Sequence, residues 1–198
     1  MTTLTTARAI ACIGLLGLAA AWPATAAVIN YSAPLSGAAE NPTNLSPGTG
    51  TAWVTVDTSA NTMRVQATFS GLVGNTTVSH IHCCTDAPGN VGVATPTPTF
   101  PGFPAGVTSG TYDQTFNITL ASSFNPAFVT ANGGTTALAW AALFAGLNAG
   151  RSYFNIHTTL FPGGEIRGFL TAVPEPGTLA LLGLGLAGLG LSRRRKAH

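Results

Sequence analysis

Three of the four histidines in this chain fall in two short alternating stretches that are typical of β-strands. His80 and His82 are separated by one residue, and His157 follows Tyr153 and Asn155 at the same spacing. Side chains on an extended strand alternate between two faces, so His80 and His82 share a face, as do Tyr153, Asn155 and His157. Imidazole nitrogens are good ligands for zinc and copper. The spacing therefore predicts that two distant segments can offer three nitrogen ligands to one metal ion.

Two adjacent cysteines, Cys83 and Cys84, follow the first histidine pair. Such a pair can form a vicinal disulfide, remain as thiols or bind metal. On the same strand Cys84 shares the face of His80 and His82, which makes it a candidate sulfur ligand. The third cysteine lies in the N-terminal segment, so the rest of the chain has no wider disulfide framework. We expect a hydrophobic core to supply the stability.

A structural role is the competing interpretation of the same histidines. Buried histidines can form hydrogen bonds across strands to Asn155, to Thr158 or to the backbone without any metal. Glu165 and Arg167 fit a supporting hydrogen-bond or ion-pair network near the histidines better than an acid–base pair, since no second carboxylate stands nearby in sequence. The chain shows no evident pair of nucleophile and base, so catalysis ranks last among the functions considered.

Alternation of apolar and polar residues predicts that β-strands position these side chains. The expected strands are 28–32, 51–57, 63–69, 78–84, 115–120, 151–158 and 165–171. The second and third are joined by a short polar loop, which predicts a hairpin. Six to eight such strands favour a mainly β fold, an antiparallel Greek-key-like β-sandwich. We also expect hydrophobic helices at the two termini.

One short helical crossover interrupts this pattern. Asn125 and Pro126 are a typical N-cap and first helical residue. Thr135 or Thr136 then begins an apolar stretch that ends near Leu147, and its alanine content favours a helix over a strand. The segment 95–110 is rich in proline and glycine and is expected to be a long surface loop.

Charge is scarce along the chain and excludes one class of partner. Only 7% of the residues are charged, against about 25% in typical soluble domains. Between residues 28 and 174 three arginines stand against five carboxylates, namely Arg64, Arg151 and Arg167 against Glu40, Asp57, Asp86, Asp113 and Glu165. This part of the chain offers no basic patch, so nucleic acid is not an expected partner.

The N-terminus has the three parts of a secretory signal peptide. Arg8 supplies a weakly positive region, residues 9–21 are apolar, and Ala24-Thr25-Ala26 offers small residues for a signal peptidase. We therefore expect residues 1–26 to be a signal peptide.

The C-terminus carries a second targeting pattern. Pro174-Glu175-Pro176 is followed by an apolar run over 178–191 and then by Arg193, Arg194 and Arg195. The run is shorter than the roughly 20 residues that cross a bilayer squarely. The order of these parts over residues 173–198 resembles the PEP-CTERM protein-sorting signal of Gram-negative bacteria. The resemblance implies an exosortase-type partner, transient anchoring in the inner membrane, and export to the cell surface or extracellular matrix.

The central segment resembles a second family, the CHRD (chordin-type) domain. The motifs that carry this resemblance occur in the family's order and are Leu35–Pro42, Gly50–Ala52, Phe69–Leu72, His80–His82, Tyr153–Thr158 and Gly163–Gly168. They cover most of residues 27–172, and Cys83-Cys84 departs from the small residues that are usual there. The resemblance implies an extracellular β-rich domain without catalytic activity.

Gly71-Leu72 and the first histidine pair are also similar to the segment of Cu/Zn superoxide dismutase that places two copper ligands on one strand. The chain lacks a further histidine for a bridging ligand, because His198 lies in the sorting tail. This argues against a redox enzyme.

Together these patterns predict an exported, non-enzymatic module that binds a partner or has a structural role at the cell surface. Exopolysaccharide or other surface proteins are the candidate partners. No cofactor is required by this interpretation. The alternative is a protein that binds copper or zinc through His80, His82 and His157, with Cys84 as a further candidate ligand.

Overall fold

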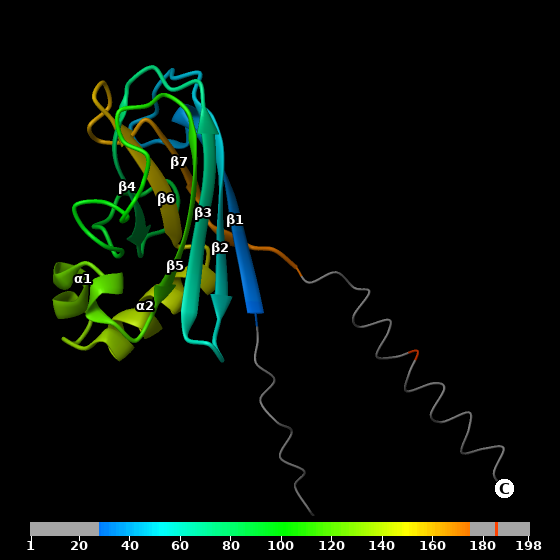
Figure 1. Ribbon diagram of the computed structural model, residues 1–198, viewed down its shortest axis with the longest axis vertical. Helices are drawn as coiled ribbons and strands as arrows, with labels where there is room; N and C mark the ends of the chain where they lie inside the picture. Colours follow the sequence, from blue (N-terminus) through cyan, green and yellow to red (C-terminus); the bar gives the residue numbers. More distant parts are fainter. Residues whose placement is uncertain (1–27, 175–184, 186–198) are drawn as a thin grey trace, which may run out of the picture.

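Within residues 28–174, a computed structural model of the chain contains one antiparallel sheet of eight strands (Figure 1). The structure describes these residues and Gly185. The expected signal peptide, the apolar run and the arginine cluster lie outside the described residues. The strands are β1 (Val28–Ser36), β2 (Thr49–Asp57), β3 (Thr62–Ser70), β4 (Thr76–Cys83), β5 (Gly110–Asn117), β6 (Ser152–Thr158), β7 (Ile166–Phe169) and β8 (Thr171–Ala172).

The order of the strands across the sheet is β4-β6-β7-β1-β2-β3-β5, with β8 paired to β1 beside this path. The sheet curls, so that β4 and β6 lie opposite β3 and β5 across the core (Figure 1). The expectation of a mainly antiparallel β domain with a helical crossover is confirmed. The strands form one continuous hydrogen-bonded sheet instead of two separate ones, and the Greek-key arrangement is not confirmed.

The predicted hairpin is β2 and β3, which pair along their whole lengths from Thr49↔Ser70 to Asp57↔Thr62. Asp57 organises the turn, because its Oδ1 accepts hydrogen bonds from the backbone N–H groups of Ser59 and Ala60, each at 2.9 Å. Short polar side chains commonly stabilise turns in this way.

Alternation along the strands places apolar side chains on the inner face of the sheet. The fully buried ones include Ala52, Val54, Val56, Met63 and Val65 from the hairpin, and Ile81, Phe154 and Ile156 from β4 and β6. Both halves of the curled sheet form the core. Its burial supplies the stability that a wider disulfide framework would otherwise provide.

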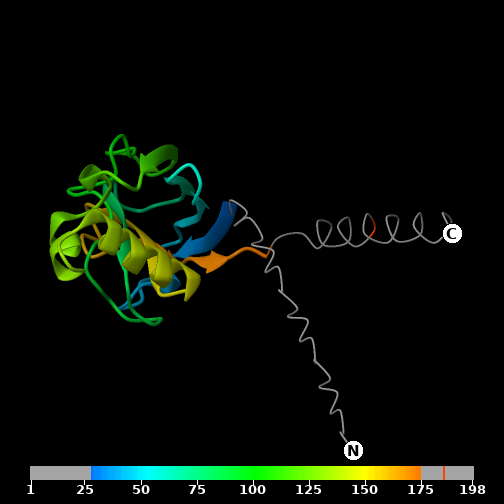
Figure 2. The same cartoon turned by 90° about the horizontal axis from the view of Figure 1, so that it is seen from below.

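The helical crossover lies between β5 and β6 and consists of α1 (Pro126–Ala131) and α2 (Thr136–Asn148). Short 3-10 turns occur at Gly37–Ala39 and Ala121–Ser123. The predicted N-cap is present, because the side chain of Asn125 accepts from Ala127 N. The second helix begins at Thr136, and the side chain of Thr135 caps it by accepting from Leu138 N. Figure 2 shows the two helices covering one end of the sheet.

Two expectations about local structure need correction. The strand expected at 115–120 is β5, which begins earlier, at Gly110, and ends at Asn117, because its pairing with β3 determines its limits. The segment 95–110 is only partly a surface loop. Phe100 and Phe103 are buried, and the Phe100 ring lies 5.9 Å from that of Phe154. This segment therefore packs against the sheet.

None of the helices in the described residues is both long enough and apolar enough to cross a membrane.

Candidate metal centre

The pairing of β4 with β6 brings the predicted site residues together. His80 is opposite Asn155, His82 is opposite Tyr153, and Val78 is opposite His157. Partners in an antiparallel pair point to the same face, and the inner face of these strands is occupied by other residues, such as the pair Ile81↔Phe154. The three histidines therefore share the outer face, as the alternation in each strand predicted.

One ring nitrogen from each of His80, His82 and His157 lies within 4.8 Å of those of the other two. The ring centroids are 5.5 to 5.9 Å apart. All three side chains are nearly removed from solvent, with exposed fractions of 5%, 8% and 9%. Two segments some seventy positions apart in the sequence thus form one compact, buried cluster of imidazoles.

Each imidazole is anchored through one nitrogen to a backbone carbonyl. His80 Nε2 lies 2.7 Å from Pro98 O, His82 Nδ1 lies 2.8 Å from Val91 O, and His157 Nδ1 lies 2.9 Å from Pro162 O. A carbonyl oxygen can only accept, so these nitrogens carry the protons of the neutral rings. The other nitrogen of each ring is left as a lone-pair acceptor.

These remaining nitrogens, His80 Nδ1, His82 Nε2 and His157 Nε2, are buried and have no hydrogen-bond partner in the described part of the chain. An unsatisfied buried polar group costs about 1–3 kcal/mol. Three of them in one cluster are unusual, because nearly all buried polar atoms find a partner. Metal-ligating histidines show the same arrangement, in which one nitrogen donates to a carbonyl and the other binds the ion.

Burial also holds the three imidazoles in the form that binds metals. Desolvation lowers the pKa of His80, of His157 and of His82, the last to about 4, while the hydrogen bonds to the carbonyls act in the opposite direction. A histidine must be neutral to ligate a metal. The cluster is therefore neutral at physiological pH.

Tyr153 fixes the position of His82. Its ring stacks on the imidazole at 4.7 Å with planes 4° apart, and its hydroxyl lies 3.3 Å from Val91 O, the carbonyl that also accepts from His82. The Arg167 guanidinium lies 4.8 Å from the centre of the Tyr153 ring on the same outer face. A cation over an aromatic ring is favourable, so arginine, tyrosine and histidine form an ordered stack.

Arg167 is 1% exposed and ties two loops to the sheet. It donates to Ala39 O at 2.6 Å, to Asn90 Oδ1 at 2.6 Å and to Pro88 O at 2.8 Å. The loop that contains Pro88 and Asn90 continues directly into Val91. Arg167 thus positions the carbonyl that holds His82, and its hydrogen bonds are of the kind expected of a supporting residue.

Glu40 belongs to the same network, although no sequence pattern singled it out as a site residue. One oxygen lies 3.7 Å from Arg167 Nε, and the other is buried and has no hydrogen-bond partner among the described residues. Burial raises the pKa of this carboxyl to about 7, and the arginine charge only partly opposes that rise. Glu40 stands within a motif quoted for the family resemblance, and only the fold shows that it faces Arg167.

Glu165 forms a separate network from that of Arg167. Its carboxylate accepts from Ser46 Oγ at 2.6 Å, Thr158 Oγ1 at 2.7 Å, Val73 N at 2.7 Å and Gly74 N at 3.1 Å. Burial alone would raise its pKa, but these hydrogen bonds lower it. Glu165 holds the loops around it and the end of β6, beside His157.

Asn155 lies between the histidines and Arg167. Its Oδ1 is buried and has no hydrogen-bond partner in the described part of the chain.

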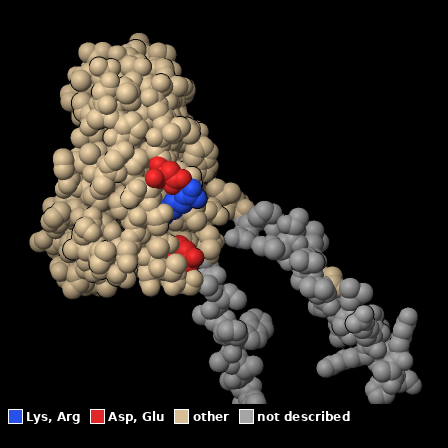
Figure 3. All heavy atoms as spheres, viewed as in Figure 1, with Lys and Arg blue, Asp and Glu red and all other residues tan. Residues whose placement is uncertain are grey.

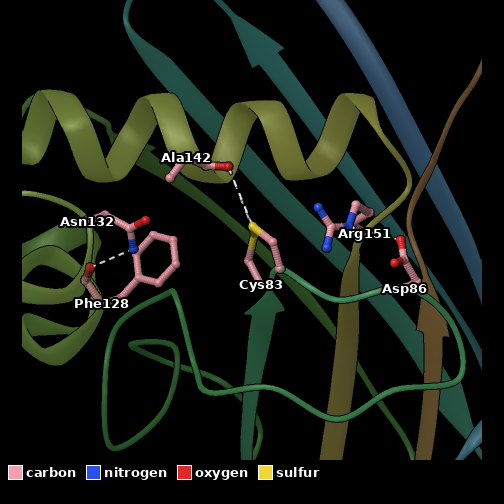
Figure 4. The surroundings of a disulfide bond; sticks show 7 residues. Cys83, Asp86, Phe128, Asn132, Ala142 and Arg151 are labelled. Atoms are coloured by element: carbon pink, nitrogen blue, oxygen red, sulfur yellow. Dashed lines mark hydrogen bonds and ion pairs between the residues drawn. A yellow bond between two sulfur atoms is a disulfide. The ribbon is translucent and has the colours of Figure 1, made fainter.

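Cys84 is not brought to this cluster. It forms a disulfide with Cys83, and its sulfur lies 3.5 Å from Ala142 O on α2. Figure 4 shows Cys83 of this disulfide beside Ala142. A Cβ at Gly146, one turn further along α2, would overlap both sulfur atoms, so the glycine allows this close approach. Of the three options open for the cysteines, the structure contains the disulfide, and the metal candidate is reduced to three nitrogens.

Comparisons with known proteins agree with both resemblances. The family model described as the CHRD domain matches residues 31–170. The model described as the PEP-CTERM protein-sorting motif matches residues 172–196. No curated protein and no solved structure matches the chain.

Proposed function

Because the chain belongs to the CHRD domain family and ends in a PEP-CTERM protein-sorting motif, we propose that it is an exported module that binds one transition-metal ion at the cell surface. The sorting motif indicates export and exosortase-dependent sorting to the surface of Gram-negative bacteria. Neither family is enzymatic. The proposed activity is therefore binding, and no reaction is assigned to the site.

The observation that carries this proposal is the set of three buried, unpartnered imidazole nitrogens from His80, His82 and His157. A purely structural role would use both nitrogens of each ring, or leave the second one exposed to water. Here the second nitrogens are withdrawn from water, and the three rings lie so close that one nitrogen of each is within 4.8 Å of those of the other two. A bound cation would satisfy all three at once.

Copper and zinc fit this donor set best, because both accept imidazole ligands readily. Calcium and magnesium prefer oxygen ligands. Three protein nitrogens would leave a further position on a four-coordinate ion for water or an outside ligand. The disulfide removes the cysteine sulfurs from consideration as thiolate ligands. The ion would then add stability by binding the folded chain alone.

A metal assay on the full chain tests the proposal. The protein is purified in a mild detergent, stripped with a chelator, and dialysed against Cu(II) or Zn(II) in separate experiments. We expect one ion per chain by elemental analysis and a rise in the melting temperature. At a free metal concentration of about 100 Kd, the added stability should be about 2.7 kcal/mol.

Two variants make the assay specific. The pair His80→Ala/His82→Ala should lose the ion and the rise in melting temperature. His198→Ala is the matched control, because it removes the one histidine outside the cluster, and it should behave as the parent chain does. Equal metal content in all three proteins, or none in any, would refute the metal site.

The details of the sorting route form a second part of the proposal. The apolar run over 178–191 would hold the protein in the inner membrane for a time, and cleavage near Pro174-Glu175-Pro176 would release it. Cell fractionation of a variant with three alanines at this element tests the idea. We expect the parent chain at the surface or in the matrix and the variant retained in the membrane fraction. The same distribution for both would refute this route.

A further inference from the structure

The outer face of β2, β3 and β5 forms a second region with a regular arrangement of side chains. Trp53, Gln66 and Asp113 are paired across the three strands, and Thr51, Thr68 and Thr111 form the neighbouring row. Their neighbours in sequence, such as Val54 and Val65, fill the core. The alternation that builds the core thus leaves one aromatic ring and several hydroxyl, amide and carboxylate groups on the outside.

This face is hollowed by two adjoining depressions. One, of about 270 Å³, lies beside Trp53 and is bordered by Gln66, Thr68, Thr111 and Asp113. The second, of about 600 Å³, continues from Thr68 and Thr111 to the ends of the strands, where Gly50 and Gly110 lie. Because the two share Thr68 and Thr111, they form one shallow trough that runs along the strands to their ends.

The trough has almost no net charge. Arg64 lies next to Asp113, with Nε donating to Oδ1 at 2.7 Å, and the two neutralise each other. Asp57, at the end of β2, accepts from its own turn. On the face seen in Figure 3, the charged side chains form one group of adjoining acidic and basic residues and one separate acidic group, and the rest of the described surface there is uncharged. A polyanion such as nucleic acid or an acidic polysaccharide would find no unpaired cation on the described part of this face.

We propose that this trough binds an uncharged polysaccharide. Trp53 is 41% exposed, and its flat apolar ring can pack on the C–H face of a sugar ring, while its neighbours exchange hydrogen bonds with sugar hydroxyls. A shallow, elongated depression suits an extended chain better than a compact ligand. Five of the bordering side chains are hydroxyls: Thr49, Thr51, Thr68, Ser70 and Thr111. This site is separate from the histidine cluster and needs no metal.

Retention of the detergent-purified full chain on polysaccharides tests this proposal. The probes are insoluble β-1,4-glucan, soluble β-1,3-glucan and galactomannan as neutral polymers, with alginate as the anionic comparison. We expect retention by at least one neutral polymer, no greater retention by alginate, and no change when a chelator is added. Trp53→Ala should weaken retention roughly tenfold, and Trp53→Phe, which keeps a flat ring, by roughly threefold or less.

Leu138→Ala is the matched control, because Leu138 is also a large exposed apolar side chain, on α2 and away from the trough. It should bind as the parent chain does. Failure of every neutral polymer to retain the parent chain would refute the proposal, and so would equal retention of Trp53→Ala. If light scattering showed a dimer that Trp53→Ala dissociates, the face would belong to self-association and the proposal would likewise be wrong.

Discussion

The outer face of β4, β6 and β7 and the outer face of β2, β3 and β5 belong to the same sheet and follow the same alternation, yet one is buried and the other is open. Loops that contain Val91, Pro98 and Pro162 close over the first face and bond to its histidines. In the described part of the chain no such loop covers the second face, and Trp53 there is 41% exposed. Alternation determines which side chains point away from the core, and the loops determine whether water reaches them.

This difference changes the chemistry of similar residues. Arg167, under the loops, makes three strong hydrogen bonds to neighbouring segments and has no access to water. Arg64, on the open face, pairs with one exposed carboxylate. Buried polar groups are costly to leave unpaired, whereas exposed ion pairs contribute little. The covered face can therefore hold a fixed set of ligands, and the open face can admit a large polymer.

The largest expected effect is the difference between substituting the buried arginine and substituting the exposed one. Arg167→Met should destabilise the chain by about 3–5 kcal/mol. It leaves the buried carbonyls of Ala39 and Pro88 without their donor and removes the positive charge that lies 3.7 Å from the Glu40 carboxyl. Arg64→Met, the matched change on the open face, should cost less than about 1 kcal/mol. Thermal unfolding followed by circular dichroism measures both. Similar losses for the two variants would mean that the two faces do not differ in this respect.

The buried titratable groups of the covered face should make the stability of the chain depend on pH. The pKa of His82 falls from 6.5 in the unfolded chain to about 4 in the fold. Between these values the unfolded chain binds more protons, so stability falls as the pH is lowered through this window. Glu40 acts in the opposite direction, because its pKa rises to about 7 and folding then favours the protonated form.

The two effects should partly cancel in the metal-free parent chain. Glu40→Gln removes the opposing effect of Glu40. The free energy of unfolding of this variant should therefore fall by on the order of 3 kcal/mol between pH 6.5 and pH 4. His80 and His157 act in the same sense as His82, since burial lowers the pKa of each. Measuring the free energy of unfolding of both proteins at several pH values tests this prediction. A flat profile in Glu40→Gln would contradict the burial of neutral histidines.

The smallest effect is expected from removing the hydroxyl of Tyr153, whose ring stacks on His82. Tyr153→Phe keeps the ring on His82 but loses the contact with Val91 O, which should cost about 1 kcal/mol. It should also weaken metal binding by roughly tenfold, because a group that orients a ligand has been removed. Trp53→Phe, its counterpart on the open face, should leave metal affinity unchanged. Competition with a chromophoric chelator measures both affinities, and equal values would show that Tyr153 does not position the ligand.

Several features of the fold could be predicted because they depend on local sequence. The hairpin of β2 and β3 follows from alternation and a polar turn, and the starts of both helices follow from Asn125 and Thr135 as caps. The grouping of His80 with His82, and of Asn155 with His157, needs nothing beyond the geometry of a single strand. The limits of β5 could not be predicted, because they depend on its partner strand.

The candidate site was only partly predictable for the same reason. Cys84 satisfied the alternation rule but turned to α2 as part of the disulfide, and the space beside Gly146 that accommodates it exists only in the folded chain. The carbonyls of Val91, Pro98 and Pro162 could not be foreseen, since any residue supplies the same backbone group. Glu40 is distant in sequence from Arg167, so its role depended on a contact that no local pattern encodes.

Local sequence is enough to predict most strands, the helix starts and which side chains share a face, because these depend on neighbours a few positions apart. Tertiary packing explains why β4 pairs with β6, why loops cover one outer face, and why the other stays open. Those outcomes depend on how distant segments pack against a common core. The three imidazoles are held together away from water because this packing is favourable. No short-range preference accounts for their position.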